Sequence, residues 1–218
     1  MRYIGIDQSL SSTGVTVLKE GEEPSFFRIV PPKEFSVGVK RLSYITDEIR
    51  KIVSKIDDDL IIAREDYAYA GKGFAFSLGE LGGCIDMKLY ESINNNSRWR
   101  VKYFSIPSNT WKLLILGNGA VKKDTKYLLT VFNKTGKSFT SDDVADSYMI
   151  CLAIKKMHGF DFDKLTDKEK FGMISSHIRK KSKITEVTIK KLIDSSIFKN
   201  YVNQTLEEFL IFTGGKNA

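Results

Sequence analysis

Residues 2–30, RYIGIDQSLSSTGVTVLKEGEEPSFFRIV, contain three short apolar runs separated by small and polar residues. The runs at 3–7, 15–18 and 26–30 are rich in β-branched and aromatic side chains, which favours strands. The connections between them are too short for a crossover, so consecutive strands are expected to run antiparallel. The segment therefore predicts a three-stranded meander whose first strand ends on an acid, Asp7.

Helix and strand patterns alternate after this meander. Apolar residues at three- and four-residue spacing predict helices, and two further apolar runs, at 60–65 and 101–106, predict strands. The expected helices cover about 36–56, 108–116, 123–134 and 141–157, and the stretch 71–94 has an aromatic- and Gly-rich start followed by a helical pattern. The order βββαβαβα is that of the ribonuclease H-like α/β fold. It implies a mixed five-stranded sheet, three strands antiparallel and then two parallel, with helices on both faces.

Residues 158–218 differ from the rest of the chain in the spacing of their apolar residues and in their basic charge. We therefore divide the chain into a nuclease-type core at 1–157 and an extension at 158–218. Apolar residues are more loosely spaced in the extension, and a basic run stands at 179–183. Leu206, Phe209 and Leu210 have helical spacing and predict a final helix. We expect a basic, helical extension packed on the core.

Composition excludes several classes of protein. Hydrophobic residues make up 42% of the 218 residues, which is enough for a folded core. No apolar run approaches the roughly 20 residues of a membrane helix, and an acid follows the N-terminus too closely for a signal peptide. We therefore expect a cytoplasmic protein. Two cysteines and two histidines make a disulfide framework or a zinc site of these residues improbable.

The charge balance is basic, with 34 Lys and Arg residues against 27 Asp and Glu residues and a formal net charge of +7. An excess of this size is compatible with nucleic-acid binding, although many basic proteins bind no nucleic acid.

Four acids stand where this fold would bring them together. Asp7 ends the first strand, Glu65 ends the fourth, and Asp143 and Asp146 share one face at the start of the last core helix. Grouped carboxylates select hard cations such as Mg²⁺ or Mn²⁺, and a pair of such ions can catalyse phosphodiester cleavage. Taken singly, each acid could instead cap a turn, end a strand in solvent or favour a helix N-terminus.

Several motifs in a fixed order resemble the RuvC family of Holliday-junction resolvases, especially its smaller phage-encoded members. The resemblance spans about residues 2–157. The motifs are IGIDQS at 4–9 with TG at 13–14, REDYA at 64–68, LGELGG at 78–83, WK at 111–112 with GNGAVKK at 117–123, and DVADS at 143–147.

This resemblance implies a magnesium-dependent, homodimeric endonuclease that nicks four-way DNA junctions in recombination and repair, with no nucleotide cofactor. Asp7, Glu65, Asp143 and Asp146 would be its metal ligands and catalytic acids. The resemblance assigns the family's basic site residues to Lys112 and Lys123, although Lys122 or Lys126 could replace Lys123. The dimer interface is expected around residues 71–94.

DNA contacts are expected from two further groups of residues. The family places an aromatic wedge soon after the second acid, where Tyr67, Tyr69, Phe74 and Phe76 all compete. Phe74 and Phe76 could equally be core or dimer-interface residues. The basic run would hold a junction arm through phosphate contacts, or else form a solvated helix face; its residues are Arg179, Lys180, Lys181 and Lys183.

Three other functions deserve comparison with junction resolution. A phosphotransferase of the actin and hexokinase type needs a D-x-G-x-T hairpin, and residues 7–9, DQS, lack its glycine. A non-catalytic DNA-binding relative would be expected to have lost one or more of the acids. A ribonuclease H-like enzyme acting on RNA–DNA hybrids remains the alternative within the nuclease class.

Overall fold

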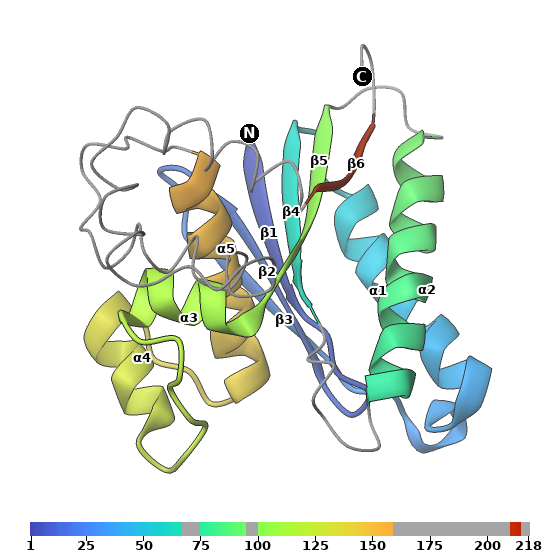
Figure 1. Cartoon of the computed structure of the whole chain (residues 1–218). Coiled ribbons are helices and arrows are strands. Elements are labelled where there is room, and N and C mark those ends of the chain that lie inside the picture. The colour runs from blue at the N-terminus through green and yellow to red at the C-terminus, as the bar shows by residue number, and fades with distance from the viewer. Residues whose placement is uncertain (67–74, 95–99, 159–209, 215–218) are drawn as a thin grey trace, which may run out of the picture.

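A computed structural model of the chain describes residues 1–66, 75–94, 100–158 and 210–214. Figure 1 shows a central sheet between two layers of helices, with α1 and α2 on one face and α3, α4 and α5 on the other. This arrangement confirms the predicted α/β architecture with helices on both faces.

The sheet has six strands in the order β3-β2-β1-β4-β5-β6. The first three strands, β1 (Arg2–Asp7), β2 (Thr13–Lys19) and β3 (Ser25–Ile29), form the predicted antiparallel meander. Strand β4 (Leu60–Glu65) pairs with β1 in parallel, and β5 (Val101–Ile106) pairs with β4 in parallel. All five predicted strands and their directions are therefore confirmed.

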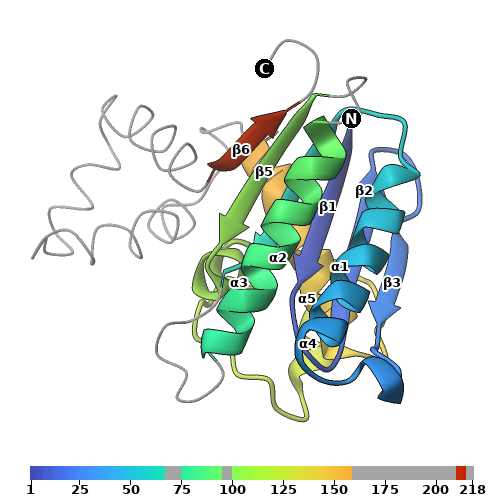
Figure 2. The same ribbon diagram turned by 90° about the vertical axis from the view of Figure 1, so that its right-hand side faces the viewer.

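The sixth strand, β6 (Leu210–Gly214), corrects the sequence analysis. Leu210 was expected in a final helix, but residues 210–214 instead pair with β5 in the antiparallel direction. Figure 2 shows β6 beside β5 at the edge of the sheet. An open edge of β5 offers unpaired backbone groups, and pairing with them outweighs a weak local helical pattern. The rest of the expected extension, 159–209, lies outside the described residues, and the division at 157 stays a prediction.

The helices agree with their predicted positions, with one shift. They are α1 (Gly38–Ser54), α2 (Ala75–Asn94), α3 (Ser108–Leu116), α4 (Tyr127–Thr135) and α5 (Asp142–His158), together with a short 3₁₀ helix at Lys33–Phe35. Helix α4 begins at Tyr127 rather than near 123. The Asp124 side chain accepts a hydrogen bond from the Lys126 backbone N–H, which holds 124–126 in a turn.

Strand alternation gives the sheet two apolar faces and so two hydrophobic cores. Tyr3, Ile61 and Ala63 belong to the core beneath α3, α4 and α5. Their neighbours in sequence, Ile4 and Ile62, belong to the core beneath α1 and α2. The central strands are buried on both sides, so their positions are fixed by packing.

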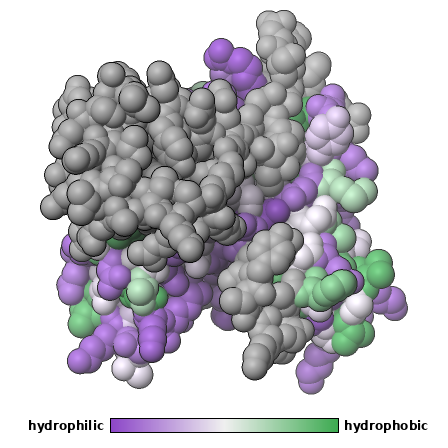
Figure 3. Space-filling view, in the orientation of Figure 1, coloured by the Kyte–Doolittle hydropathy of each residue, from purple (hydrophilic) through white to green (hydrophobic). Residues whose placement is uncertain are grey.

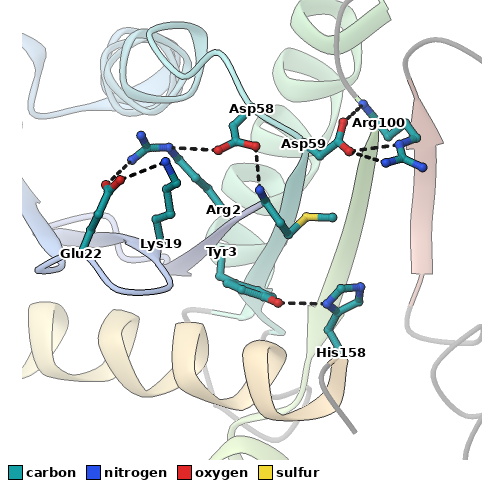
Figure 4. Close-up of polar contacts among 9 residues, drawn as sticks. Arg2, Tyr3, Lys19, Glu22, Asp58, Asp59, Arg100 and His158 are labelled. Atoms are coloured by element: carbon teal, nitrogen blue, oxygen red, sulfur yellow. Dashed lines mark hydrogen bonds and ion pairs between the residues drawn. The ribbon is translucent and has the colours of Figure 1, made fainter.

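The end of the sheet where β1 begins is fastened by polar contacts (Figure 4). The N-terminal ammonium of Met1 binds Asp58 at 2.7 Å, and Arg100 binds Asp59 at 2.6 Å. The Tyr3 hydroxyl lies 2.9 Å from Nδ1 of His158, at the last residue of α5. These contacts lie at the end of the sheet opposite Asp7.

The described surface in Figure 3 is mainly hydrophilic, with small separate apolar patches rather than one broad apolar face. None of the helices that the structure describes combines the length and apolar character needed to cross a membrane.

Candidate active site

Two of the predicted acids meet because their strands are parallel neighbours. Asp7 is the last residue of β1 and Glu65 is the last residue of β4. Since β1 and β4 pair in parallel, their carboxyl ends reach the same edge of the sheet, at the lower end in Figure 1. Alternation along the strands points both side chains to the face covered by α5.

Helix α5 packs unusually closely on this face because two glycines leave room for it. A Cβ atom built on Gly5 would lie 2.0 Å from the Ser147 carbonyl oxygen, and one on Gly14 would lie 2.0 Å from the Asp143 carbonyl oxygen. A buried hydrogen bond of 2.8 Å also joins the hydroxyls of Thr16 and Ser147. This close approach brings the start of α5 to the ends of the strands.

Three carboxylates therefore share one small buried space. Each of Asp7, Glu65 and Asp146 offers an oxygen, and these three oxygens lie within 4.8 Å of one another. Asp146 is fully buried and Asp7 is 4% exposed. Burial raises the pKa of Asp7 well above its usual value, and a hydrogen bond to Glu65 and the negative charge of Glu65 raise it further.

Lys123 and Tyr127 complete the cluster. The Lys123 ammonium lies 2.5 Å from Oδ2 of Asp146 and 3.8 Å from Asp7, and the Tyr127 hydroxyl donates a hydrogen bond to Oδ1 of Asp146. Burial raises the pKa of Asp146, whereas Lys123 and Tyr127 both lower it. Burial by itself would lower the pKa of Lys123, but the charges of Asp7 and Asp146 raise it above its usual value.

Comparison with solved structures identifies the architecture that carries this cluster. The Thermus thermophilus RuvC structure superposes with a TM-score of 0.51 and 17% identity, covering 70% of this chain and 92% of that one. T. thermophilus RuvC in complex with a Holliday junction substrate gives a TM-score of 0.52 and 15% identity, with 70% and 91% covered. The chain has the RuvC fold. No protein-family model and no curated protein sequence matches it.

Within the RuvC fold of this chain, the fourth predicted acid has different neighbours. Asp143 is not among the three acids whose oxygens gather in the described part of the chain. Its Oδ2 accepts a hydrogen bond of 3.2 Å from Ser141 and lies 3.8 Å from Nε of Arg28. The structure thus brings together three of the four acids, and a catalytic role for Asp143 stays a prediction.

The structure also shows which of the predicted basic site residues contacts the acids. Of the adjacent lysines, Lys123 reaches the acids, whereas Lys122 is exposed beside it. Lys112 lies with its ammonium 5.2 Å from the ring centroid of Trp111, a cation–π contact in the middle of α3. The RuvC fold therefore holds Lys123 in the carboxylate cluster, whereas Lys112 lies against Trp111.

Phe76 is the only one of the predicted aromatic and C-terminal DNA-contact residues that lies in the part of the chain that the structure describes. Phe76 is 86% exposed near the start of α2, so it is not a core residue. The other candidates lie outside the described residues; they are Tyr67, Tyr69, Phe74, Arg179, Lys180, Lys181 and Lys183.

The donors of the cluster fit a divalent cation. Asp7, Glu65 and Asp146 present oxygen ligands of the kind that Mg²⁺ and Mn²⁺ prefer, and their mutual repulsion favours a bound cation. In the structure the Lys123 ammonium supplies part of this balancing charge. Because the pKa of Asp7 is raised, cation binding is expected to release protons and to strengthen as the pH rises.

Tyr127 is a site residue that the sequence analysis did not single out. In the predicted helix over 123–134, Tyr127 would stand one turn after Lys123, and this spacing was the available signal. In the structure the Tyr127 side chain is buried and orients Asp146.

We expect Tyr127→Phe to weaken both the fold and cation binding. The substitution removes a hydrogen bond to a buried carboxylate, which should lower the free energy of unfolding by about 1.5–3 kcal/mol. It should weaken Mn²⁺ binding by about tenfold or more, because such partners fix the orientation of a metal ligand. Calorimetric Mn²⁺ titration and urea denaturation measure the two effects. Tyr44→Phe, in α1 on the other face of the sheet, is the control, and equal Mn²⁺ affinity of the two variants would contradict the role.

Proposed function

We propose that this protein is a divalent-metal-dependent endonuclease that resolves four-way DNA junctions. The observation that carries the proposal is the buried cluster of Asp7, Glu65 and Asp146, with Lys123 beside it, at the strand ends of a RuvC fold. A cluster of two buried acids and one half-buried acid is costly for stability, which favours a functional reason for its presence.

The side chains of the cluster divide the chemistry of phosphodiester hydrolysis between them. When bound, Mg²⁺ ions held by Asp7, Glu65 and Asp146 would supply an activated water and stabilisation of the leaving oxygen, in a two-metal scheme. Tyr127 holds Asp146 in one orientation. Lys123 brings positive charge to the place where a scissile phosphate would develop negative charge.

Branched DNA is the substrate that we propose. The chain carries a net charge of +7, and the exposed ring of Phe76 can stack on an unpaired base. T. thermophilus RuvC, which shares the fold, has been solved with a Holliday junction substrate. We further propose that the basic run at 179–183 and Lys112 contact the phosphate backbone, and that the enzyme acts in DNA recombination in the cytoplasm of a cell or of a phage-infected host.

Cleavage of defined substrates tests the function. The chain is incubated with Mg²⁺ and a labelled four-way junction, a linear duplex of the same sequence, or an RNA–DNA hybrid. Paired nicks in the junction, with the duplex intact, are the expected result. Preferential cleavage of the hybrid would instead establish a ribonuclease H-like enzyme, and junction binding without cleavage would establish a non-catalytic relative.

We propose that two copies assemble through α2, because paired nicking of a symmetric junction needs two active sites. Met87 is 66% exposed on this helix, so an apolar side chain is available to a second copy.

Met87→Glu is expected to convert the dimer into a monomer, because it places a charge in an apolar interface. Size-exclusion chromatography with light scattering measures the change in mass. Leu129→Glu on α4 is a matched control, since Leu129 is also exposed, at 58%, on a different helix. A wild-type chain that remains monomeric even with junction DNA would contradict the dimer.

A further inference from the structure

A second polar cluster lies on the reverse face of the strands that carry the acids. Its centre is Arg64, which is 5% exposed between the sheet and α2. Arg64 binds both carboxylate oxygens of Asp86 on α2, at 2.7 and 2.9 Å, and the Tyr103 hydroxyl donates to the same carboxylate at 2.7 Å. The contacts of Arg64 raise its pKa despite burial, so it is charged at all working pH values.

The two clusters lie on opposite faces of the sheet, at the ends of the same two strands. Arg64 directly precedes Glu65, and its Nη1 donates a hydrogen bond of 3.2 Å to the Glu65 carbonyl oxygen. Gln8 directly follows Asp7, and a Cβ atom on Gly82 of α2 would lie 3.2 Å from its Oε1 and 3.4 Å from Cζ of Arg64. The residues next to both acids thus pack on one turn of α2.

We propose that Arg64 is a positioning residue, which ties the Glu65 main chain to α2 and so sets the place of the Glu65 carboxylate relative to Asp7 and Asp146. This inference rests on the proposed function, because it assigns a purpose to the exact place of Glu65. It also makes α2 part of the active-site framework, although α2 lies on the opposite face of the sheet.

The chemistry of the pair favours positioning over stability as its purpose. The attraction within a buried ion pair often fails to offset the free energy needed to remove both charges from water. Apolar residues of similar volume often stabilise the fold as well or better. What apolar residues cannot supply is direction. The planar guanidinium binds Asp86 with two nitrogens and directs a third to one carbonyl oxygen, which fixes Glu65 in a single orientation.

The double variant Arg64→Met/Asp86→Leu separates the two purposes. It removes both charges together, so no unpaired buried charge remains to unfold the protein. The matched control is Asp47→Leu/Lys88→Met, which removes the ion pair of 3.0 Å that ties α2 to α1 away from the strand ends. Four properties are measured for each protein: the melting temperature, Mn²⁺ affinity without DNA, junction affinity without metal, and kcat with KM for the junction.

The expected result for the Arg64/Asp86 variant is Mn²⁺ binding weaker by about tenfold and kcat lower by about 10–100-fold. Its junction affinity and KM should remain close to those of the wild type, and its melting temperature should fall only by the loss of the Tyr103 hydrogen bond to Asp86; the control should match the wild type throughout. Wild-type Mn²⁺ affinity and kcat in a folded Arg64/Asp86 variant would overturn the proposal, as would loss of folding or equal losses in the control.

The outcomes also distinguish this proposal from the proposed function. If the wild type binds Mn²⁺ but cleaves no junction, the proposed function fails, while the Mn²⁺ affinities still decide the role of Arg64. If the wild type binds no Mn²⁺, both proposals are overturned.

Discussion

Asp146→Asn abolishes junction cleavage and leaves junction binding intact; this is the largest effect that we expect. The substitution keeps the shape of the side chain and an oxygen for the Tyr127 hydrogen bond, but it removes the negative charge next to Lys123. Losing one ligand from a three-carboxylate cluster should lower the cleavage rate by about a thousandfold or more. Gel-based cleavage and fluorescence anisotropy with the same junction measure the two properties.

Asp7→Asn and Glu65→Gln should have the same effect on cleavage, and Asp7→Asn should also stabilise the fold. The pKa of Asp7 is raised by burial and by Glu65, so its ionised form destabilises the folded state above the usual aspartate pKa, and this cost disappears as the pH falls. Replacing it with a neutral amide should therefore raise the free energy of unfolding at pH 7 by on the order of 1 kcal/mol.

Of two neighbouring acids, one is a control for these variants and the other is a further test of the site. Asp142→Asn, at the first residue of α5, should retain full activity. Asp143→Asn tests the fourth predicted acid, which contacts Ser141 and Arg28 in the structure; loss of cleavage would add it to the site. Full cleavage by Asp146→Asn would remove that residue from the catalytic machinery and contradict the site as described.

The second large effect is expected from Gly5→Ala, which adds a single methyl group. Its Cβ would stand 2.0 Å from the Ser147 carbonyl oxygen and 2.6 Å from the Cys151 backbone nitrogen, and neither atom belongs to a flexible side chain. Helix α5 would have to move away from β1, which should cost about 3 kcal/mol or more. The same movement would separate Asp146 from Asp7 and reduce cleavage.

Gly83→Ala is the matched control for this steric prediction. Gly83 lies within α2 with open space around its Cβ position, so alanine should stabilise the helix by about 0.5–1 kcal/mol. Urea denaturation of both variants gives the comparison. A Gly5→Ala protein as stable as the wild type would show that α5 does not pack on β1 as closely as described.

The parts of the fold that the sequence predicted are those with strong local patterns. The three strands of the meander, the two parallel strands and the helices each have a clear apolar period and turn residues at their ends. Asp7 and Glu65 were predictable because the strand order places two strand ends side by side.

The parts that the sequence left open depend on contacts between distant residues. The sequence does not distinguish Lys122 from Lys123, but in the structure Lys123 contacts the acids. The turn formed by Asp124 beside it explains why α4 begins at Tyr127 rather than near 123. Tyr127 and Arg64 gain their roles from partners on other elements, Asp146 and Asp86. Strand β6 forms because β5 has a free edge to pair with, and the residues around Leu210 in the sequence carry no information about that edge.

Strand β6 also has a consequence for the order in which the protein can be completed during synthesis. Strand β5 ends at Ile106, but its partner begins at Leu210, about a hundred residues later. At ordinary rates of translation the edge of β5 therefore stays open for on the order of 5–20 s on each new chain. An open edge can pair with strands of other molecules. During this interval a nascent chain is therefore most able to misassemble with other nascent chains that are being translated from the same messenger RNA.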